Sequence, residues 1–246
     1  GGIVGSMLAY WLPELGQKNI VGLEKSTVIP SDIASTAHAS DFVYNTTHDK
    51  LGCWTTDFSR KFYEEHGFFL KKGGLEICRK DDDERWEELK RKVGSGKAFG
   101  TNVRLISASE AKEKFPLLEE ESIRGAMWDP DAGLVTPRSQ DVVSFAVEHA
   151  KDKGALTTFT ETPALDFEIE NGRVTGVKTD KGTIKTEKVV LASGIWGPLM
   201  GAKAGVPVPL MPVEHPLLFF GPLPEAQGAE DYLVYPLMRD QGNSAY

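Results

Sequence analysis

Two glycines and one acidic residue near the start of the chain have the spacing of a nucleotide-binding turn. Gly2 and Gly5 open a helical pattern, and Glu24 ends a short apolar strand pattern 19 residues after Gly5. Glycines at such a turn let the backbone approach a pyrophosphate, whose charge the free N–H groups of a helix start can bind. An acid about 20 residues further on can accept hydroxyl groups of a ribose. The three residues therefore predict a dinucleotide site.

The order of elements around this turn supports the prediction, because a glycine pair alone is common. The pattern predicts a helix over Ser6–Leu15, a stop at Gly16 and then a short apolar strand before Glu24. The alternative is a plain helix and strand that pack together, with Glu24 as a solvated strand end. Only the last two glycines of a G-x-G-x-x-G motif are present, so we expect the chain to be a fragment that begins inside this motif.

A second predicted strand end could also contact a ligand. Lys188–Leu191 continues an apolar run that would be buried on both faces, as in a parallel sheet. Ser193 and Gly194 follow directly, and a glycine at the carboxyl end of a strand permits close approach of a ligand. Trp196 either forms a wall of that pocket or is an ordinary core residue.

Composition excludes several other classes of protein. The 246 residues include 28 Lys and Arg against 36 Asp and Glu, which gives a net charge of −8 and opposes binding to nucleic acid or acidic lipid. Cys53 and Cys78 stand in unrelated contexts, so neither a disulfide framework nor a metal site is indicated. No run of 18 apolar residues occurs, and we expect no membrane span. The expected location is cytoplasmic, with the mitochondrial matrix as the alternative.

Other patterns predict the remaining elements. We expect a strongly charged helix over Asp81–Val93 to be a solvated outer face, and Ser107 with Glu110 to form a capping box that begins another helix. Ser139–Lys153 has the apolar spacing of an amphipathic helix. The predicted hairpin turns are Lys71-Lys72-Gly73, which would join strands at 67–70 and 74–78, and the dipeptides Asn171-Gly172 and Lys181-Gly182.

Several stretches together carry a family resemblance. They are Gly2-Ile3-Val4-Gly5 with Glu24, Ser35-Thr36-Ala37-His38-Ala39, Gly73-Gly74-Leu75-Glu76, Asp131-Ala132-Gly133-Leu134-Val135, Gly172-Arg173-Val174-Thr175-Gly176-Val177, Val189-Val190-Leu191-Ala192-Ser193-Gly194-Ile195-Trp196 and Pro212-Val213-Glu214-His215. In this order the chain resembles the FAD-dependent amine oxidoreductases related to D-amino-acid oxidase and glycine oxidase. The likeness is strongest to dimethylglycine and sarcosine dehydrogenases and to dimethylglycine oxidase, and it covers essentially the whole chain.

The resemblance implies an α/β fold with two interleaved domains. One is a doubly wound, Rossmann-like FAD-binding layer lacking its first strand, expected over residues 1–60 and 122–205. The other is a mixed-sheet α+β substrate domain, expected over residues 61–121 and 206–246 and truncated like the first.

His38 matches the position of a histidine that carries FAD covalently, through the 8α carbon of the flavin, in dimethylglycine-type enzymes. A neutral imidazole is nucleophilic, which suits this bond. The family pattern continues with Pro-Gly after His-Ala, whereas Ser40-Asp41 follow here, and the alternative is that His38 only packs against the flavin. The other cofactor-binding residues that we expect, besides Gly2, Gly5 and Glu24, are Lys25, Ser35, Thr36, Ala39, Ser193, Gly194 and Trp196.

The resemblance also implies a catalytic pair, His215 and Tyr246. Hydride leaves the carbon beside an amine nitrogen only when the nitrogen lone pair is free, so a bound ammonium must first lose a proton. A histidine polarised by a phenol could accept it. The alternative for His215 is a histidine hydrogen-bonded in the core.

The expected function is FAD-dependent oxidation of an N-methylated glycine or a similar secondary or tertiary amine, by hydride transfer to flavin N5. The partners would be a small amine and, as electron acceptor, oxygen or an electron-transfer flavoprotein. We expect the fragment alone to be incomplete for activity. Two alternatives stay open: a non-catalytic regulatory relative, and a noncovalent FAD oxidoreductase of 2-hydroxy acids or glycerol 3-phosphate.

Overall fold

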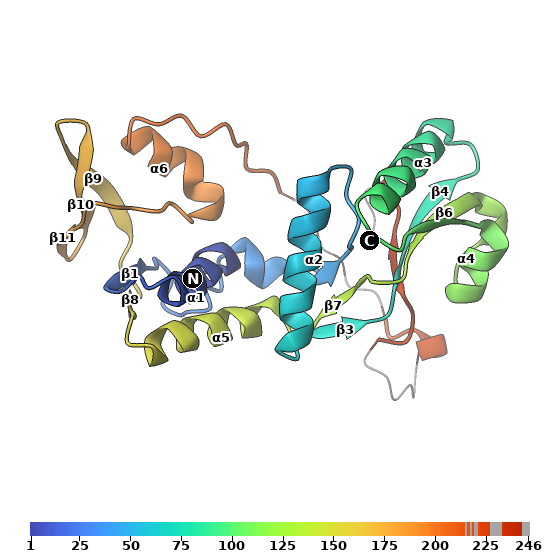
Figure 1. Ribbon diagram of the computed structural model, residues 1–246, viewed down its shortest axis with the longest axis horizontal. Helices are drawn as coiled ribbons and strands as arrows, with labels where there is room; N and C mark the ends of the chain where they lie inside the picture. Colours follow the sequence, from blue (N-terminus) through green and yellow to red (C-terminus); the bar gives the residue numbers. More distant parts are fainter. Residues whose placement is uncertain (215, 217, 219–220, 227–232, 243–246) are drawn as a thin grey trace. The chain divides into compact units, whose positions relative to one another are not determined.

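The computed structural model describes all residues except 215, 217, 219–220, 227–232 and 243–246 (Figure 1). The chain forms two compact units. Unit 1 comprises Gly1–Ser40 and Arg138–Phe219, and unit 2 comprises Asp41–Pro137 and Phe220–Tyr246. Each unit combines helices with its own sheets, which confirms the mixed α/β class. Within the described residues, no helix combines the length and apolar character that crossing a membrane requires.

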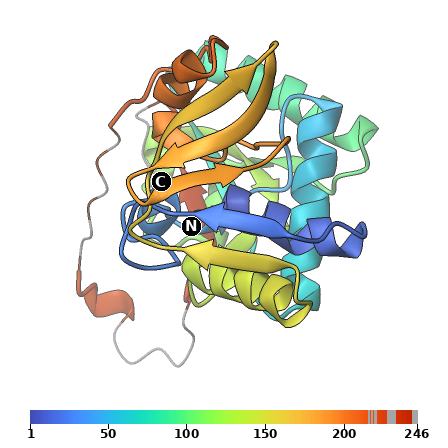
Figure 2. The ribbon, with the colours of Figure 1, turned by 90° about the vertical axis from the view of Figure 1, so that its left-hand side faces the viewer.

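A short parallel sheet and two helices form the first half of unit 1. Strand β1 (Ile20–Leu23) pairs in parallel with β8 (Leu156–Phe159), and Figure 2 shows the two strands side by side. Helices α1 (Ile3–Glu14) and α5 (Ser139–Asp152) pack against this pair. The amphipathic spacing of α5 explains its placement. Its apolar residues Val143, Val147 and Ala150 form a local core with Ala9 of α1 and Leu156 of β8.

An antiparallel sheet with a short helix forms the second half of unit 1. Its strands are β9 (Ala164–Glu170), β10 (Arg173–Thr179) and β11 (Gly182–Lys185), in the order β11-β10-β9. Asn171 and Gly172 both have positive φ, 51° and 74°, as a tight two-residue hairpin turn requires. Helix α6 (Gly197–Lys203) contributes Met200 to a core with Phe167 and Val177. Two 3₁₀ turns, η1 (Ser35–His38) and η3 (Gly194–Trp196), complete the unit.

Unit 2 is built on a four-stranded mixed sheet covered on both faces. Its order is β12-β4-β6-β5, with only β12 and β4 parallel. Residues alternate between the faces: Leu75 and Ile77 of β4 pack with Ala111 of α4, whereas Cys78 packs with Leu89 of α3. The bounds are β4 (Gly74–Arg79), α3 (Asp83–Ala98), β5 (Arg104–Ser107), α4 (Ala108–Lys114), η2 (Glu120–Ser122), β6 (Ile123–Asp129), η4 (Pro224–Ala226) and β12 (Leu237–Arg239).

A three-stranded antiparallel sheet completes unit 2. Its order is β2-β7-β3, and helix α2 contacts β3. These pairings place residues 41–60 and 122–137 in the same unit as residues 61–121, so the compact units have other bounds than the two domains expected from the sequence. The elements are β2 (Phe42–Val43), α2 (Lys50–Glu65), β3 (Phe69–Lys71) and β7 (Gly133–Val135).

Two expectations about strands are wrong. β3 and β4 do not form a hairpin, because β3 pairs with β7 while β4 pairs with β6 and β12. Lys72 and Gly73 instead connect β3 in one sheet to β4 in the other. Their N–H groups donate to the carbonyl of Ala132. Lys188–Leu191 is not a strand, since it pairs with no strand among the described residues and leaves Val190 66% exposed.

Candidate functional site

The glycine turn and the acid after β1 lie together in unit 1. Oε2 of Glu24 is 3.0 Å from the Gly1 nitrogen, and Oε1 accepts a hydrogen bond from the Ser26 N–H at 2.8 Å. Partial burial acts to raise the pKa of Glu24, but hydrogen bonds from the Ser26 N–H and the Ser31 side chain act to lower it, and the pKa is lowered. The carboxylate is therefore ionised at neutral pH and can accept hydrogen bonds from hydroxyl groups.

The start of α1 presents backbone rather than side chains. Its N-cap residue, Gly2, is extended (φ −93°, ψ 173°) and makes no side-chain cap, and the first turn contains no acidic residue. The Ile3 N–H donates to Oγ1 of Thr36 at 3.0 Å, which ties α1 to turn η1. A Cβ at Gly5 would lie 3.2 Å from the Cβ of Ala192, tighter than ordinary contact. Glycine at position 5 thus permits a close approach that a larger residue would obstruct.

His38 stands at the end of η1 with its side chain exposed. Its Nε2 lies 3.1 Å from the carbonyl oxygen of Asp32. Because a carbonyl only accepts, Nε2 carries the proton in this contact, and in the neutral ring Nδ1 then has a lone pair. The exposed ring therefore offers a nucleophilic nitrogen to a molecule bound beside η1.

Turn η3 contains the predicted residues Gly194 and Trp196, and Ser193 directly precedes it. Lys25 Nζ lies 3.4 Å from the centroid of the Trp196 ring, a cation–π contact. Gly194 has a φ of 52°, which favours glycine. Oγ of Ser193 is buried without a hydrogen-bond partner among the described residues, so this hydroxyl is suited to a ligand group.

Unit 1 thus connects most of the predicted site through direct contacts. Glu24 reaches the glycine turn, Thr36 reaches the helix start and Ala192 lies beside Gly5. Ser35 begins the turn that His38 ends, and Ala39 is the C-cap residue of this turn. The predicted catalytic residues, His215 and Tyr246, lie outside the described residues.

Two contributors were missed from the sequence. The Ser31 N–H donates to the Gly1 carbonyl at 3.0 Å, and Arg138 donates to the carbonyl of Ala39 at 3.1 Å. The Ser31 side chain also forms a hydrogen bond that lowers the pKa of Glu24, and nothing in its spacing pointed to this site. Arg138 stands about 100 residues from η1 in sequence, and nothing in its spacing pointed to that turn.

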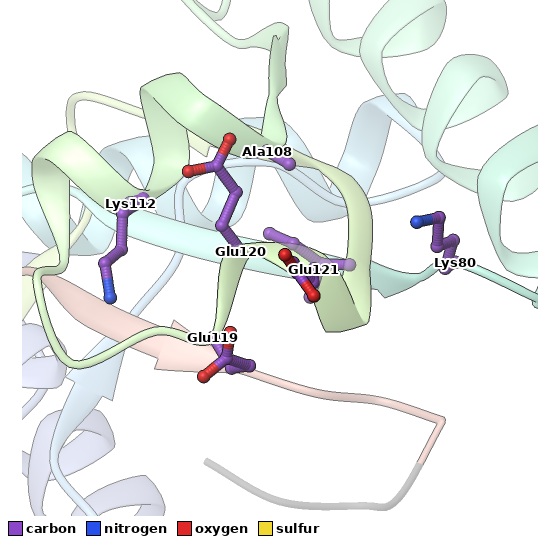
Figure 3. A pocket seen from close by; sticks show the side chains of 7 residues that line it. Lys80, Ala108, Lys112, Glu119, Glu120 and Glu121 are labelled. Carbon is purple, nitrogen blue, oxygen red and sulfur yellow. The ribbon is translucent and has the colours of Figure 1, made fainter.

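Figure 3 shows a separate surface hollow, which belongs to unit 2. It is lined by side chains of both charges: Lys80 directly after β4, Lys112 of α4, and Glu119, Glu120 and Glu121 at the start of η2. Lys112 Nζ donates to the carbonyl of Leu118 at 2.6 Å, so part of the positive charge is already engaged. This hollow shares no residue with the site of unit 1.

These features fit a dinucleotide. A helix start whose own N-cap residue makes no side-chain cap follows a glycine turn, and an ionised acid follows the next strand. The buried Ser193 hydroxyl has no hydrogen-bond partner among the described residues. Fold and site together define an α/β protein of the dinucleotide-binding class. The sequence pattern of the DAO family, "FAD dependent oxidoreductase", matches residues 1–246, and the chain belongs to this family.

The chain is similar to several known proteins. It is 27% identical to human mitochondrial sarcosine dehydrogenase over 256 residues, covering 100% of this chain and 27% of the relative. It is 30% identical to the mouse mitochondrial pyruvate dehydrogenase phosphatase regulatory subunit, covering 87% of this chain and 25% of that one. The crystal structure of L-proline dehydrogenase from P. horikoshii superposes with a TM-score of 0.75 at 32% identity, covering 84% of this chain and 54% of that one. The chain spans about a quarter of the length of these two curated relatives.

Proposed function

We propose that the protein containing this chain oxidises an N-methylated glycine or a similar secondary or tertiary amine, with FAD as cofactor and hydride transfer to flavin N5. The observation that carries the proposal is the contact network of unit 1, which joins the glycine turn, Glu24 and the His38 turn. Similarity to sarcosine dehydrogenase over the full chain favours an N-methyl amine as substrate class.

Each part of the network has a role in holding FAD. The start of α1 at Gly2 and Gly5 would bind the pyrophosphate through backbone N–H groups and the positive end of the helix dipole. Glu24 would accept the hydroxyl groups of the adenosine ribose. Ser193 would donate its hydroxyl hydrogen to a cofactor oxygen, and Lys25 would balance negative charge while it holds Trp196 in place.

His38 is the proposed attachment residue. Its imidazole would form one C–N bond to the 8α methyl carbon of the flavin. Forming it would remove one hydrogen from the imidazole and one from the methyl group, and oxygen would take up both hydrogens with their electrons to give hydrogen peroxide. A covalent tether fixes the ring and tunes its electron affinity.

His215 and Tyr246 are the proposed catalytic residues. His215 would take the proton from the bound ammonium, which frees the nitrogen lone pair and allows hydride to leave the adjacent carbon. Tyr246 would polarise the histidine. Oxygen and an electron-transfer flavoprotein are both suitable acceptors for the electrons.

Anaerobic reduction of the full-length protein tests the proposed substrate class. Sarcosine or dimethylglycine should bleach the flavin absorbance when oxygen is excluded, because the electrons then stay on the cofactor. A 2-hydroxy acid and glycerol 3-phosphate serve as controls and should leave the spectrum unchanged. Bleaching by a control but by neither amine would overturn the assignment to amines.

A regulatory role is the second candidate, favoured by the 30% identity to the phosphatase regulatory subunit. A non-catalytic relative would keep the fold and lose the chemistry. The same experiment separates the two, since a regulatory protein would show no bleaching with any of these compounds.

A further inference from the structure

Arg138 contacts the backbone on both sides of His38. Its Nη2 donates to the carbonyl of Ala39 at 3.1 Å and lies 3.5 Å from the carbonyl of Ala37. Arg138 is also the N-cap residue of α5, but its side chain makes no cap there. The side chain therefore contacts the backbone that flanks His38.

Turn η1 has little to hold it in place by itself. It is a 3₁₀ turn of four residues with no buried side chain, and such turns have poorer hydrogen-bond geometry than α-helices. Its ends are closed by the bonds from the Ala37 N–H to the Ala34 carbonyl at 2.9 Å and from the Ala39 N–H to the Thr36 carbonyl at 3.4 Å. The position of His38 thus depends on groups outside the turn.

Helix α5 is a rigid support for those outside contacts. Val142, Val143 and Ala146 in its first two turns are fully buried. The guanidinium next to this anchored segment forms charge-assisted hydrogen bonds, which are stronger than neutral ones. Thr36 ties the other side of η1 to α1, so the turn is held between two helices of unit 1.

We propose that Arg138 is a positioning residue, which holds the η1 backbone so that the His38 imidazole meets the flavin 8α carbon. The inference rests on the proposed attachment at His38 and deepens it. Arg138 does not touch the reacting atoms. A lysine can reach one carbonyl, whereas the planar guanidinium presents several donors in a fixed arrangement, so a lysine should replace it only in part.

The test compares Arg138→Gln and Arg138→Lys with the unchanged full-length protein. The covalent fraction is the flavin that stays with the polypeptide after acid precipitation, divided by total bound flavin. We expect Arg138→Gln to lower this fraction at least fivefold while total flavin changes less than twofold, with Arg138→Lys in between. Arg173→Gln, at an exposed arginine that begins β10 in the same unit, should leave the fraction unchanged.

Hydrogen exchange provides a readout that does not need the cofactor. Amides of residues 35–39 in flavin-free Arg138→Gln should exchange about tenfold faster than in the unchanged protein, with no change in α5. The proposal is wrong if Arg138→Gln exchanges these amides no faster than the wild-type protein, or exchanges them faster but keeps the wild-type covalent fraction. If the wild-type protein carries only noncovalent flavin, the attachment at His38 fails, and the positioning role fails with it whatever the exchange rates show.

Discussion

Replacing Lys92 by methionine is expected to lower the free energy of unfolding of unit 2 by about 3 to 5 kcal/mol. Lys92 Nζ lies 2.6 Å from Oε2 of Glu76, and the two side chains are only 4% and 0% exposed. The other oxygen of Glu76 has no hydrogen-bond partner among the described residues. Loss of Lys92 would leave the Glu76 carboxylate buried without its ion-pair partner.

Denaturant unfolding of the full-length protein, followed by hydrogen exchange at α3 and β4 amides, measures this loss within unit 2. Lys90→Met is the matched control, because Lys90 belongs to the same helix and pairs with Glu87 while both side chains are about half exposed. An exposed pair contributes less than about 1 kcal/mol. If the two variants lose the same free energy of unfolding, the buried pair contributes no more to stability than the exposed pair, and the prediction is wrong.

A double variant separates the charge effect from packing. Lys92→Met combined with Glu76→Leu removes both charges, and replacing both partners of a buried pair by apolar residues is often neutral or stabilising. We expect the double variant to recover most of the stability that Lys92→Met loses. If it is less stable than Lys92→Met alone, the loss arises from packing instead of the uncompensated carboxylate.

His38→Ala is expected to abolish covalent flavin completely, because no nitrogen remains to form the bond, while noncovalent flavin binding survives through α1 and Glu24. Tryptic digestion should yield the peptide Ser26–Lys50, which contains both His38 and His48. Tandem mass spectrometry of the unchanged full-length protein should place the flavin mass on His38.

His48→Ala is the control within the same peptide. Its Nε2 lies 3.1 Å from Glu88 in unit 2, so we expect this variant to keep all of its covalent flavin. Flavin found on His48, or retained covalently by His38→Ala, would exclude His38 as the attachment residue.

Local patterns predicted the elements whose signals are complete within a few residues. The Ser107 side chain accepts the Glu110 N–H at 3.1 Å as expected, although the Glu110 carboxylate pairs with Arg104 instead of closing the capping box. The Asn171-Gly172 turn and the buried face of α5 also match. These features depend on residues close in sequence.

Pairing between distant segments could not be predicted in the same way. The turn-like residues before Gly74 suggested a hairpin, but a turn signal does not specify which strand lies next to β4. The charge of α3 suggested a fully solvated face, yet Lys92 is buried because Glu76 on β4 lies opposite it. Both outcomes depend on partners far along the chain.

The site was predicted in part for the same reason. The glycines and Glu24 follow a spacing set by one helix and one strand, so the sequence indicates them directly. Arg138 and Ser31 join the site only because folding brings α5 and the segment after β1 to it.

The flavin content of a Gly5→Val variant of the full-length protein tests most directly whether the start of α1 holds the cofactor. The added side chain would crowd Ala192 and the backbone approach to the pyrophosphate. Gly94→Val is the matched control, since a Cβ at this helical glycine of unit 2 meets open space. Gly5→Ala and circular dichroism check that the fold persists. We predict stoichiometric flavin in Gly94→Val and a loss of at least tenfold in Gly5→Val; a folded Gly5→Val protein with full flavin content would contradict the account.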